Sequence, residues 1–240
     1  MSARSCCIVH GWENNNCNEN IGCYGCHVVS IILIPTRENV MSGVLNKVAY
    51  HFTGPKLRDG TPLPAIGHKL VFKGKPILCK QGLHFSLHPF DALQYAPGPL
   101  LHKVHYGGKV VMGDDKGVCT ERIIIASIDA TDMLRKFACD EALRVLPKDA
   151  PDIVRRYLTT RDEGLRDRAR SVAWYAAGDV ARYAAWYAAW SVAWSAARDA
   201  ARSAALYAAG DVACDKERKR QRATFLALVQ QAFTKKWENI

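Results

Sequence analysis

Histidines concentrate in the middle of the chain, where they could serve acid–base chemistry or bind a metal. His51, His84 and His102 each fall in a run of strand-forming residues, and His88 and His105 lie close by. An imidazole titrates near neutral pH, so histidines that converge from paired strands suit proton transfer. Residues 102 and 105 point to opposite faces of a strand, so at most one of them joins a cluster. Histidines hydrogen-bonded within strands and turns are the simpler interpretation.

The elements that must position these histidines are short strands separated by glycine and proline. Turn signals such as Gly54-Pro55 and Asp59-Gly60 punctuate the segment. Helical patterns occupy residues 89–96 and 130–146, the first opening at a proline. The sequence therefore predicts an α+β fold: a small, mostly antiparallel sheet domain with two short helices at 44–148, followed by a long Ala-rich α-helical C-terminal region. The strand patterns lie at 48–53, 69–72, 76–79, 83–86, 100–106, 109–112 and 121–128.

The sheet domain contains a set of motifs made up of Cys79, Gly82, His84, Asp91, Tyr95, Asp114, Asp115 and Lys116. The adjacent aspartates of the set could share Mg²⁺, although Gly-Asp-Asp is ordinary turn chemistry. The whole set resembles an uncharacterised domain family encoded in phages and prophages. The resemblance covers roughly residues 48–135, and the family has no established reaction. The resemblance therefore implies a phage or prophage origin rather than a mechanism.

A second, looser resemblance is to ADP-ribosyltransferases, which use NAD. The segments at 50–53, 82–95 and 100–106 follow the order of the strands and helix in that class. The resemblance implies that His51 holds the NAD ribose, Tyr95 stacks on the nicotinamide and Glu121 orients the acceptor. Glu121 lies in no convincing motif, so this enzyme is an alternative rather than our leading hypothesis. Without it, the sequence predicts no cofactor.

The first residues of the chain, 1–43, are rich in cysteine and asparagine and differ from the rest. Cys23, Cys26 and His27 have a spacing that could supply zinc ligands, with Cys17 nearby. The further ligands that a complete zinc site needs do not occur at a recognised spacing, so these residues are weak candidates. Met41-Ser42-Gly43 resembles an ordinary start of a chain, and we expect residues 1–43 to form a poorly ordered extension.

The C-terminal region, 149–240, contains tetrads of the form x-[Ser/Tyr/Asp]-[Ala/Val]-Ala at 170–213, followed by a basic helix at 214–236. Alanine favours helix, so helices are predicted at 152–177, 179–209 and 211–236, with Gly178-Asp179 and Gly210-Asp211 as breaks. A four-residue repeat drifts by about 40° per tetrad on a helix, which predicts that no single apolar face persists.

Aromatic and basic residues of this tail are our candidates for a partner-binding surface. A spacer or a helix for homo-oligomerisation is the simpler interpretation of the tail, and a solvated helix face the simpler one of its charges. Aromatics interleaved with arginine could also stack nucleic-acid bases. The candidates are Trp186, Trp190, Trp194, Arg198, Arg202, Arg218, Arg220 and Arg222.

Charge and hydropathy limit the possible partners and compartments of the protein. The chain carries 33 Lys and Arg against 23 Asp and Glu, a formal net charge of +10. No apolar run is long enough to span a bilayer, which predicts no membrane partner, and the cysteines suit a reducing cytoplasm. Our leading hypothesis is a non-enzymatic phage or prophage accessory protein in the host cytoplasm. It would bind a host protein, in counter-defence or host takeover, and nucleic-acid binding is a second alternative to this hypothesis.

Overall fold

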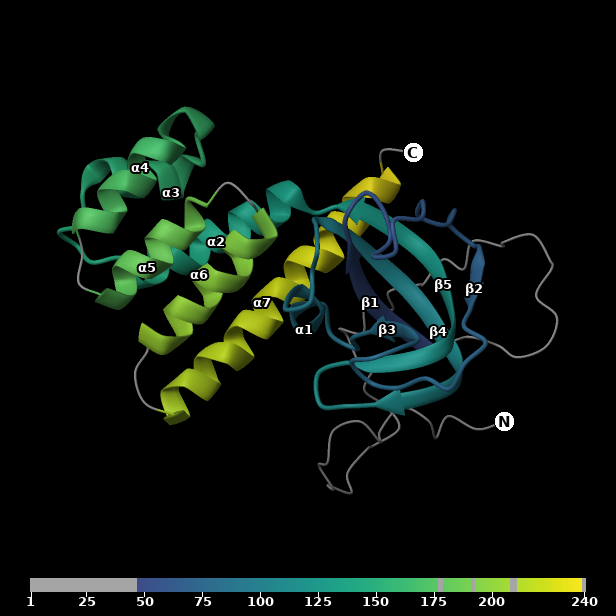
Figure 1. The fold of residues 1–240 in the computed structure, drawn as a ribbon. Helices are drawn as coiled ribbons and strands as arrows, with labels where there is room; N and C mark the ends of the chain where they lie inside the picture. The colour runs from purple at the N-terminus through teal and green to yellow at the C-terminus, as the bar shows by residue number, and fades with distance from the viewer. Residues whose placement is uncertain (1–46, 177–178, 191–192, 208–210, 239–240) are drawn as a thin grey trace, which may run out of the picture. The chain divides into compact units, whose positions relative to one another are not determined.

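The computed structural model describes residues 47–176, 179–190, 193–207 and 211–238. Contacts divide the chain into two units, Met1–Ser42 and Gly43–Ile240, and the described residues all belong to the second. Its strands lie within 47–129 and most of its helices follow, which confirms the predicted α+β fold (Figure 1). The predicted division at 148/149 does not separate two compact units.

The sheet is antiparallel and is built around one long hairpin. β4 (Leu100–Met112) pairs with β5 (Gly117–Asp129), β1 (Lys47–Thr53) pairs with β4, and β2 (Lys69–Val71) and β3 (Leu83–Phe85) both pair with β5. The predicted strands 100–106 and 109–112 are one strand. Gly107-Gly108 forms a bulge rather than a turn, since Gly108 has φ +70° and a side chain there would collide with Thr120.

The sheet also curls, so that β3 and the residue after it lie beside β1. β3 pairs with the first residues of β5, and Ser86, next to β3, exchanges two backbone hydrogen bonds with Tyr50 of β1 at 2.8 and 2.9 Å. The circuit from β1 through β4, β5 and β3 therefore returns to β1. This curl gives the sheet an inner face and an outer face, on which side chains alternate along each strand.

The outer face packs against helices, and the inner face is smaller and partly polar. Phe52, Leu101 and Ile128 share the larger apolar cluster with helical residues. On the inner face Ala49, Val104 and Phe85 belong to a second cluster, in which Phe85 stacks on Tyr106 at 3.9 Å between ring centroids. Histidines and an arginine complete the inner face, as described below.

The helical part of the unit consists of α1 (Pro89–Leu93) and α2 (Thr131–Val145), followed by α3 (Asp152–Thr160), α4 (Glu163–Ala176), α5 (Asp179–Ala188), α6 (Ala193–Tyr207) and α7 (Asp211–Glu238). The helix predicted at 152–177 is in fact two. Arg161 adopts a left-handed conformation with φ 59°, and the Asp162 carboxylate accepts a hydrogen bond from the backbone N–H of Gly164 at 2.9 Å. Asp162 therefore caps the next helix, which is a signal that the sequence carries.

The helix predicted at 179–209 is also broken, after α5. The guanidinium of Arg135, buried in α2, donates to the carbonyl oxygens of Ala188 (3.2 Å) and Trp190. These carbonyls belong to the end of α5, where the helix leaves them without an internal partner. A residue distant in sequence thus stabilises the break, and for that reason the tetrad pattern alone did not predict it.

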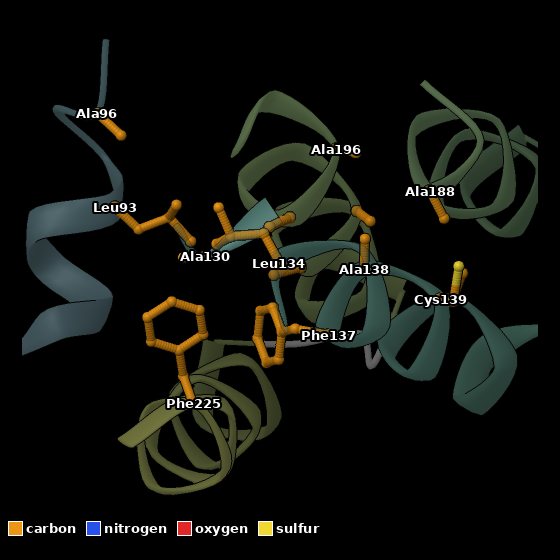
Figure 2. Packing of buried hydrophobic residues seen from close by; sticks show 14 of the residues in the cluster. Leu93, Ala96, Ala130, Leu134, Phe137, Ala138, Cys139, Ala188, Ala196 and Phe225 are labelled. Carbon is orange, nitrogen blue, oxygen red and sulfur yellow. The ribbon is translucent and has the colours of Figure 1, made fainter. Parts of the chain in front are cut away.

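Because the tetrad tract is divided into short helices, its alanines stay on one face of each helix. The prediction that no single apolar face persists was therefore wrong. The third and fourth positions of several tetrads are buried against α2, because the stripe drifts little within helices as short as α5 and α6. Alanine side chains allow these helices to pack closely, as around Ala138, Ala188 and Ala196 in Figure 2. The buried alanines in the described part of the tract are Ala173, Ala184, Ala185, Ala188, Ala189, Ala196, Ala197, Ala200, Ala201 and Ala204.

Helix α7 presents a buried stripe that contacts α1, α2 and the sheet. Gln221, Phe225, Val229 and Phe233 recur every four residues and are all nearly inaccessible to solvent. The Phe225 ring lies edge-on to Phe137 of α2, with 5.0 Å between centroids (Figure 2). Because large aromatics dominate the energetics of a core, this stripe ties α7 to the rest of the unit.

Polar contacts also hold α7 in place, near both ends of the stripe. Glu141 of α2 is fully buried, and its carboxylate accepts hydrogen bonds from the Arg220 guanidinium and from the side-chain amide of Gln221 at 3.1 Å. Further along α7, the Lys236 ammonium donates to the Ser127 carbonyl at 2.6 Å. Arg220 is therefore the charge partner of a buried carboxylate.

Replacing Arg220 by Met should destabilise the protein by about 3–5 kcal/mol, because Glu141 would remain buried without its cation. Burial already raises the pKa of Glu141 against the opposing effect of Arg220, so in the variant this pKa rises further. Unfolding in urea is the measurement. The deficit should be largest at neutral pH and shrink in acid, where the carboxyl group is protonated.

The matched control is Arg218→Met, on the same helix but exposed, which should change stability by no more than about 0.5 kcal/mol. Equal losses in the two variants would show that Arg220 does not stabilise Glu141.

Candidate functional site

Three of the motif residues build a turn before β3 rather than a reactive centre. The imidazole of His84 accepts a hydrogen bond from the backbone N–H of Cys79 at 3.2 Å, across a turn in which Ile77 pairs with Gln81. Cys79 is exposed and holds a left-handed backbone, with φ 63°. The strand predicted at 76–79 is therefore a turn. Gly82 has φ +112°, and a side chain there would collide with Val118.

The environment of His84 fits this structural role. Burial lowers the pKa of His84, although a hydrogen bond with the backbone of Gly82 opposes the shift. The neutral ring can accept a hydrogen bond, as its contact with Cys79 requires.

A second group of motif residues links the hairpin turn to the end of α1. The Tyr95 hydroxyl donates to the Asp115 carboxylate, and the Lys116 ammonium lies 3.9 Å from the centroid of the Tyr95 ring. Burial is the largest single influence on the pKa of Lys116 and lowers it, but hydrogen bonds with Cys79 and Tyr95 together outweigh burial and raise the pKa. Asp115 is thus engaged by Tyr95, while Asp114 is exposed, and the two carboxylates do not act as a pair.

The remaining motif residue, Asp91, binds helix α7. Its carboxylate forms an ion pair with Arg222, and burial raises the pKa of Asp91 against the opposing effect of Arg222. Next to it, the Nδ1 atom of His88 accepts a hydrogen bond from the backbone N–H of Phe90 at 3.1 Å and so caps α1. Burial, and then Arg222, lower the pKa of His88 to about 4.

The three residues implied by the ADP-ribosyltransferase resemblance do not converge. His51 lies opposite His102, which lies opposite Ser127, whereas Glu121 lies opposite Gly107. At about 3.3 Å per residue, the levels of Ser127 and Glu121 are about 20 Å apart along β5. The Glu121 carboxylate instead forms an ion pair with Lys69 of the edge strand β2 at 2.8 Å, and the Tyr95 hydroxyl is bound to Asp115.

The inner face of the curled sheet brings together a polar group that sequence analysis only partly anticipated. The two ring nitrogens of His102 are hydrogen-bonded to the hydroxyls of Thr53 (2.8 Å) and Ser127 (2.6 Å). His51 lies beside His102, with 6.5 Å between ring centroids. Both histidines were predicted to be able to converge, and His105 lies on the opposite face.

Arg122 is the member of this group that sequence analysis missed. It is 4% exposed, and its guanidinium donates to the backbone carbonyl of His84. Burial lowers the pKa of Arg122 to about 10. Burial also lowers the pKa of His51 well below its usual value, and Arg122 adds to this effect. Local alternation with Glu121, which faces outwards, is the signal that could have placed Arg122 inside.

The proposed partner-binding residues of the tail divide into internal and exposed positions. Trp186 and Trp190 lie edge-on to each other and beneath the Arg170 guanidinium, which is 4.9 Å from the Trp190 centroid. Arg198 pairs with its neighbour Asp199 at 2.8 Å. Arg220 and Arg222 bind Glu141 and Asp91, while Arg202 and Arg218 are exposed. The side chain of Trp194 lies outside the described residues.

Among the described residues, no group of three or more His, Cys, Asp and Glu side chains is arranged to hold a metal ion. The zinc candidates Cys17, Cys23, Cys26 and His27 lie outside the described residues, as does the rest of the predicted extension at 1–43. Within the described ranges, no helix has the length and apolarity needed to cross a membrane.

In the comparison with known proteins, the region of the sheet is similar to a family of unknown function. Residues 47–136 match the family described as Domain of unknown function (DUF7666). The match begins with β1 and ends within α2, so it includes the curled sheet and all of the motif residues. No curated protein and no solved structure matches the chain.

The polar inner face should make the protein sensitive to acid. Burial, and then Arg122, lower the pKa of His102 to about 4, below the value near 6.5 of an unfolded chain. Between these values only the unfolded state binds the proton, so stability is lost as the pH falls from about 6.5 to 4. His102 alone should contribute a loss of about 3 kcal/mol, measured by urea unfolding at a series of pH values.

In this series His102→Gln should flatten the pH dependence, whatever its effect on stability at neutral pH. The control is His68→Gln, since His68 is exposed, and it should keep the slope of the natural protein. An unchanged slope in His102→Gln would contradict the assignment.

Proposed function

We propose that the protein is a non-enzymatic binding protein that docks on an acidic surface of a partner protein through exposed cations of α6 and α7. The observation that carries this proposal is a set of four exposed cations on these helices, none of which forms an ion pair within the described residues. They are Arg202, Lys216, Arg218 and Lys219.

Helix packing brings Arg202 of α6 and Arg218 of α7 to neighbouring positions. The side-chain amide of Gln221 donates to the Ala201 carbonyl at 2.9 Å, so α6 and α7 meet where Arg202 and Arg218 project. Neighbouring exposed cations attract an acidic surface and accelerate its association.

The packing of the aromatic residues favours a protein partner over nucleic acid. Base stacking needs exposed rings beside the cations, whereas Trp186 and Trp190 pack against each other and against Arg170. The motif resemblance implies a phage or prophage origin. We therefore propose a bacterial host protein as the partner and the host cytoplasm as the place of action, in counter-defence or host takeover.

Neutralising the four cations together, as Arg202→Gln, Lys216→Gln, Arg218→Gln and Lys219→Gln, should abolish capture of the partner from nuclease-treated host lysate. Electrostatic docking weakens with ionic strength, so capture by the natural chain should also decline as salt is raised. The measurement is affinity capture with the full chain followed by quantification of each captured protein.

The matched control removes the same charge from the sheet domain, at four other exposed cations. It should capture the same partner as the natural chain. Identical capture by both variants would refute docking at α6 and α7, and capture that disappears on nuclease treatment would assign nucleic acid instead. The control substitutions are Lys56→Gln, Arg58→Gln, Lys73→Gln and Lys75→Gln.

A further inference from the structure

Arg122 is a buried cation without a carboxylate partner. Its side chain is 4% exposed, and within the described residues it forms no ion pair. The neighbouring Glu121 points away and binds Lys69, while Cys119 favours the charged form of Arg122. A pKa of about 10 leaves the guanidinium charged at neutral pH.

The hydrogen bonding of Arg122 is also incomplete. One terminal nitrogen donates to the His84 carbonyl, while the Nε atom is buried and has no hydrogen-bond partner in the described part of the chain. Burying a charge without a partner costs several kcal/mol, and a buried donor without an acceptor adds to this cost. An arrangement of this kind is stabilised when an anion occupies it.

The inner face to which Arg122 belongs suits an anion as well. On the inner face, β1 contributes His51 and Thr53, β4 contributes His102 and β5 contributes Ser127, and none of these is acidic. His51, His84 and His102 lie within electrostatic reach of Arg122, and burial disfavours their protonation while the site is empty of negative charge. An anion would reverse this balance and raise their pKa values.

Residue His51 is partly exposed, whereas Arg122 and His102 are buried. An anion bound to Arg122 would therefore lie in surroundings where charge-assisted hydrogen bonds are strong.

We propose that the inner face of the curled sheet is an oxyanion site, in which Arg122 binds the phosphate or carboxylate group of a small ligand and His51 and His102 flank it. This site lies on the sheet and is separate from the exposed cations of α6 and α7, so it does not depend on the proposed partner. It gives the sheet domain a ligand of its own.

The first experiment titrates the full chain with inorganic phosphate and, in a second arm, with acetate. The histidine ring signals are followed by NMR, and sodium chloride of equal ionic strength serves as the reference. We expect the His51 and His102 signals to shift saturably and the pKa of His51 to rise, while His105 on the opposite face stays unchanged. A response to phosphate alone assigns a phosphate-bearing ligand, and a response to both anions extends the site to carboxylates.

Substitutions test the role of Arg122 itself. Arg122→Gln should abolish the saturable shifts. If that variant does not fold, His51→Glu provides the test, because it places a carboxylate beside the guanidinium. His51→Glu should raise the melting temperature and weaken the phosphate response by about tenfold or more, since a charge pair of this kind competes with the ligand.

The matched control is His105→Glu, on the opposite face of β4, which should leave the phosphate response intact. The proposal is overturned if neither anion moves the His51 and His102 signals beyond the chloride reference. It is also overturned if His51→Glu responds to phosphate as the natural chain does.

Discussion

The docking of α7 is the constraint on which the rest of the described structure depends. A stripe of four buried side chains at four-residue spacing crosses from the α6 contact at Gln221 to the sheet at Phe233. In the middle of the stripe, Phe225 fills the space between Phe90 of α1 and Phe137 of α2. The helical region therefore shares one hydrophobic core with the sheet and is not a separate appendage.

This constraint explains the positions of several motif residues. Asp91 binds α7 through its ion pair with Arg222. The hairpin turn contacts the end of α1 through Tyr95, Asp115 and Lys116. The motif set thus maintains the curl of the sheet and its junction with the helices. Our two functional proposals therefore rest on other residues, namely Arg122 on the inner face and the exposed cations of α6 and α7.

Much of the fold follows from local patterns in the sequence. Period-two runs located β1, β4 and β5, and proline, glycine and aspartate located α1, α5 and α7. The sequence did not reveal features that depend on distant partners. Arg135 ends α5 through a contact across the core, and the pairing of Ser86 with Tyr50 curls the sheet. Glu121-Arg122 resembles an exposed charged pair, and only the curl turns Arg122 into a buried, unpaired cation.

Native-state hydrogen exchange measures the central claim, that sheet and helices form one cooperative unit through α7. Amides of α7 between 221 and 233 and those of β4 between 101 and 106 should open with the same free energy in the natural chain. Phe225→Ala should lower both by the same amount, about 3–5 kcal/mol. Faster exchange in α7 with unchanged protection in β4 would contradict the account.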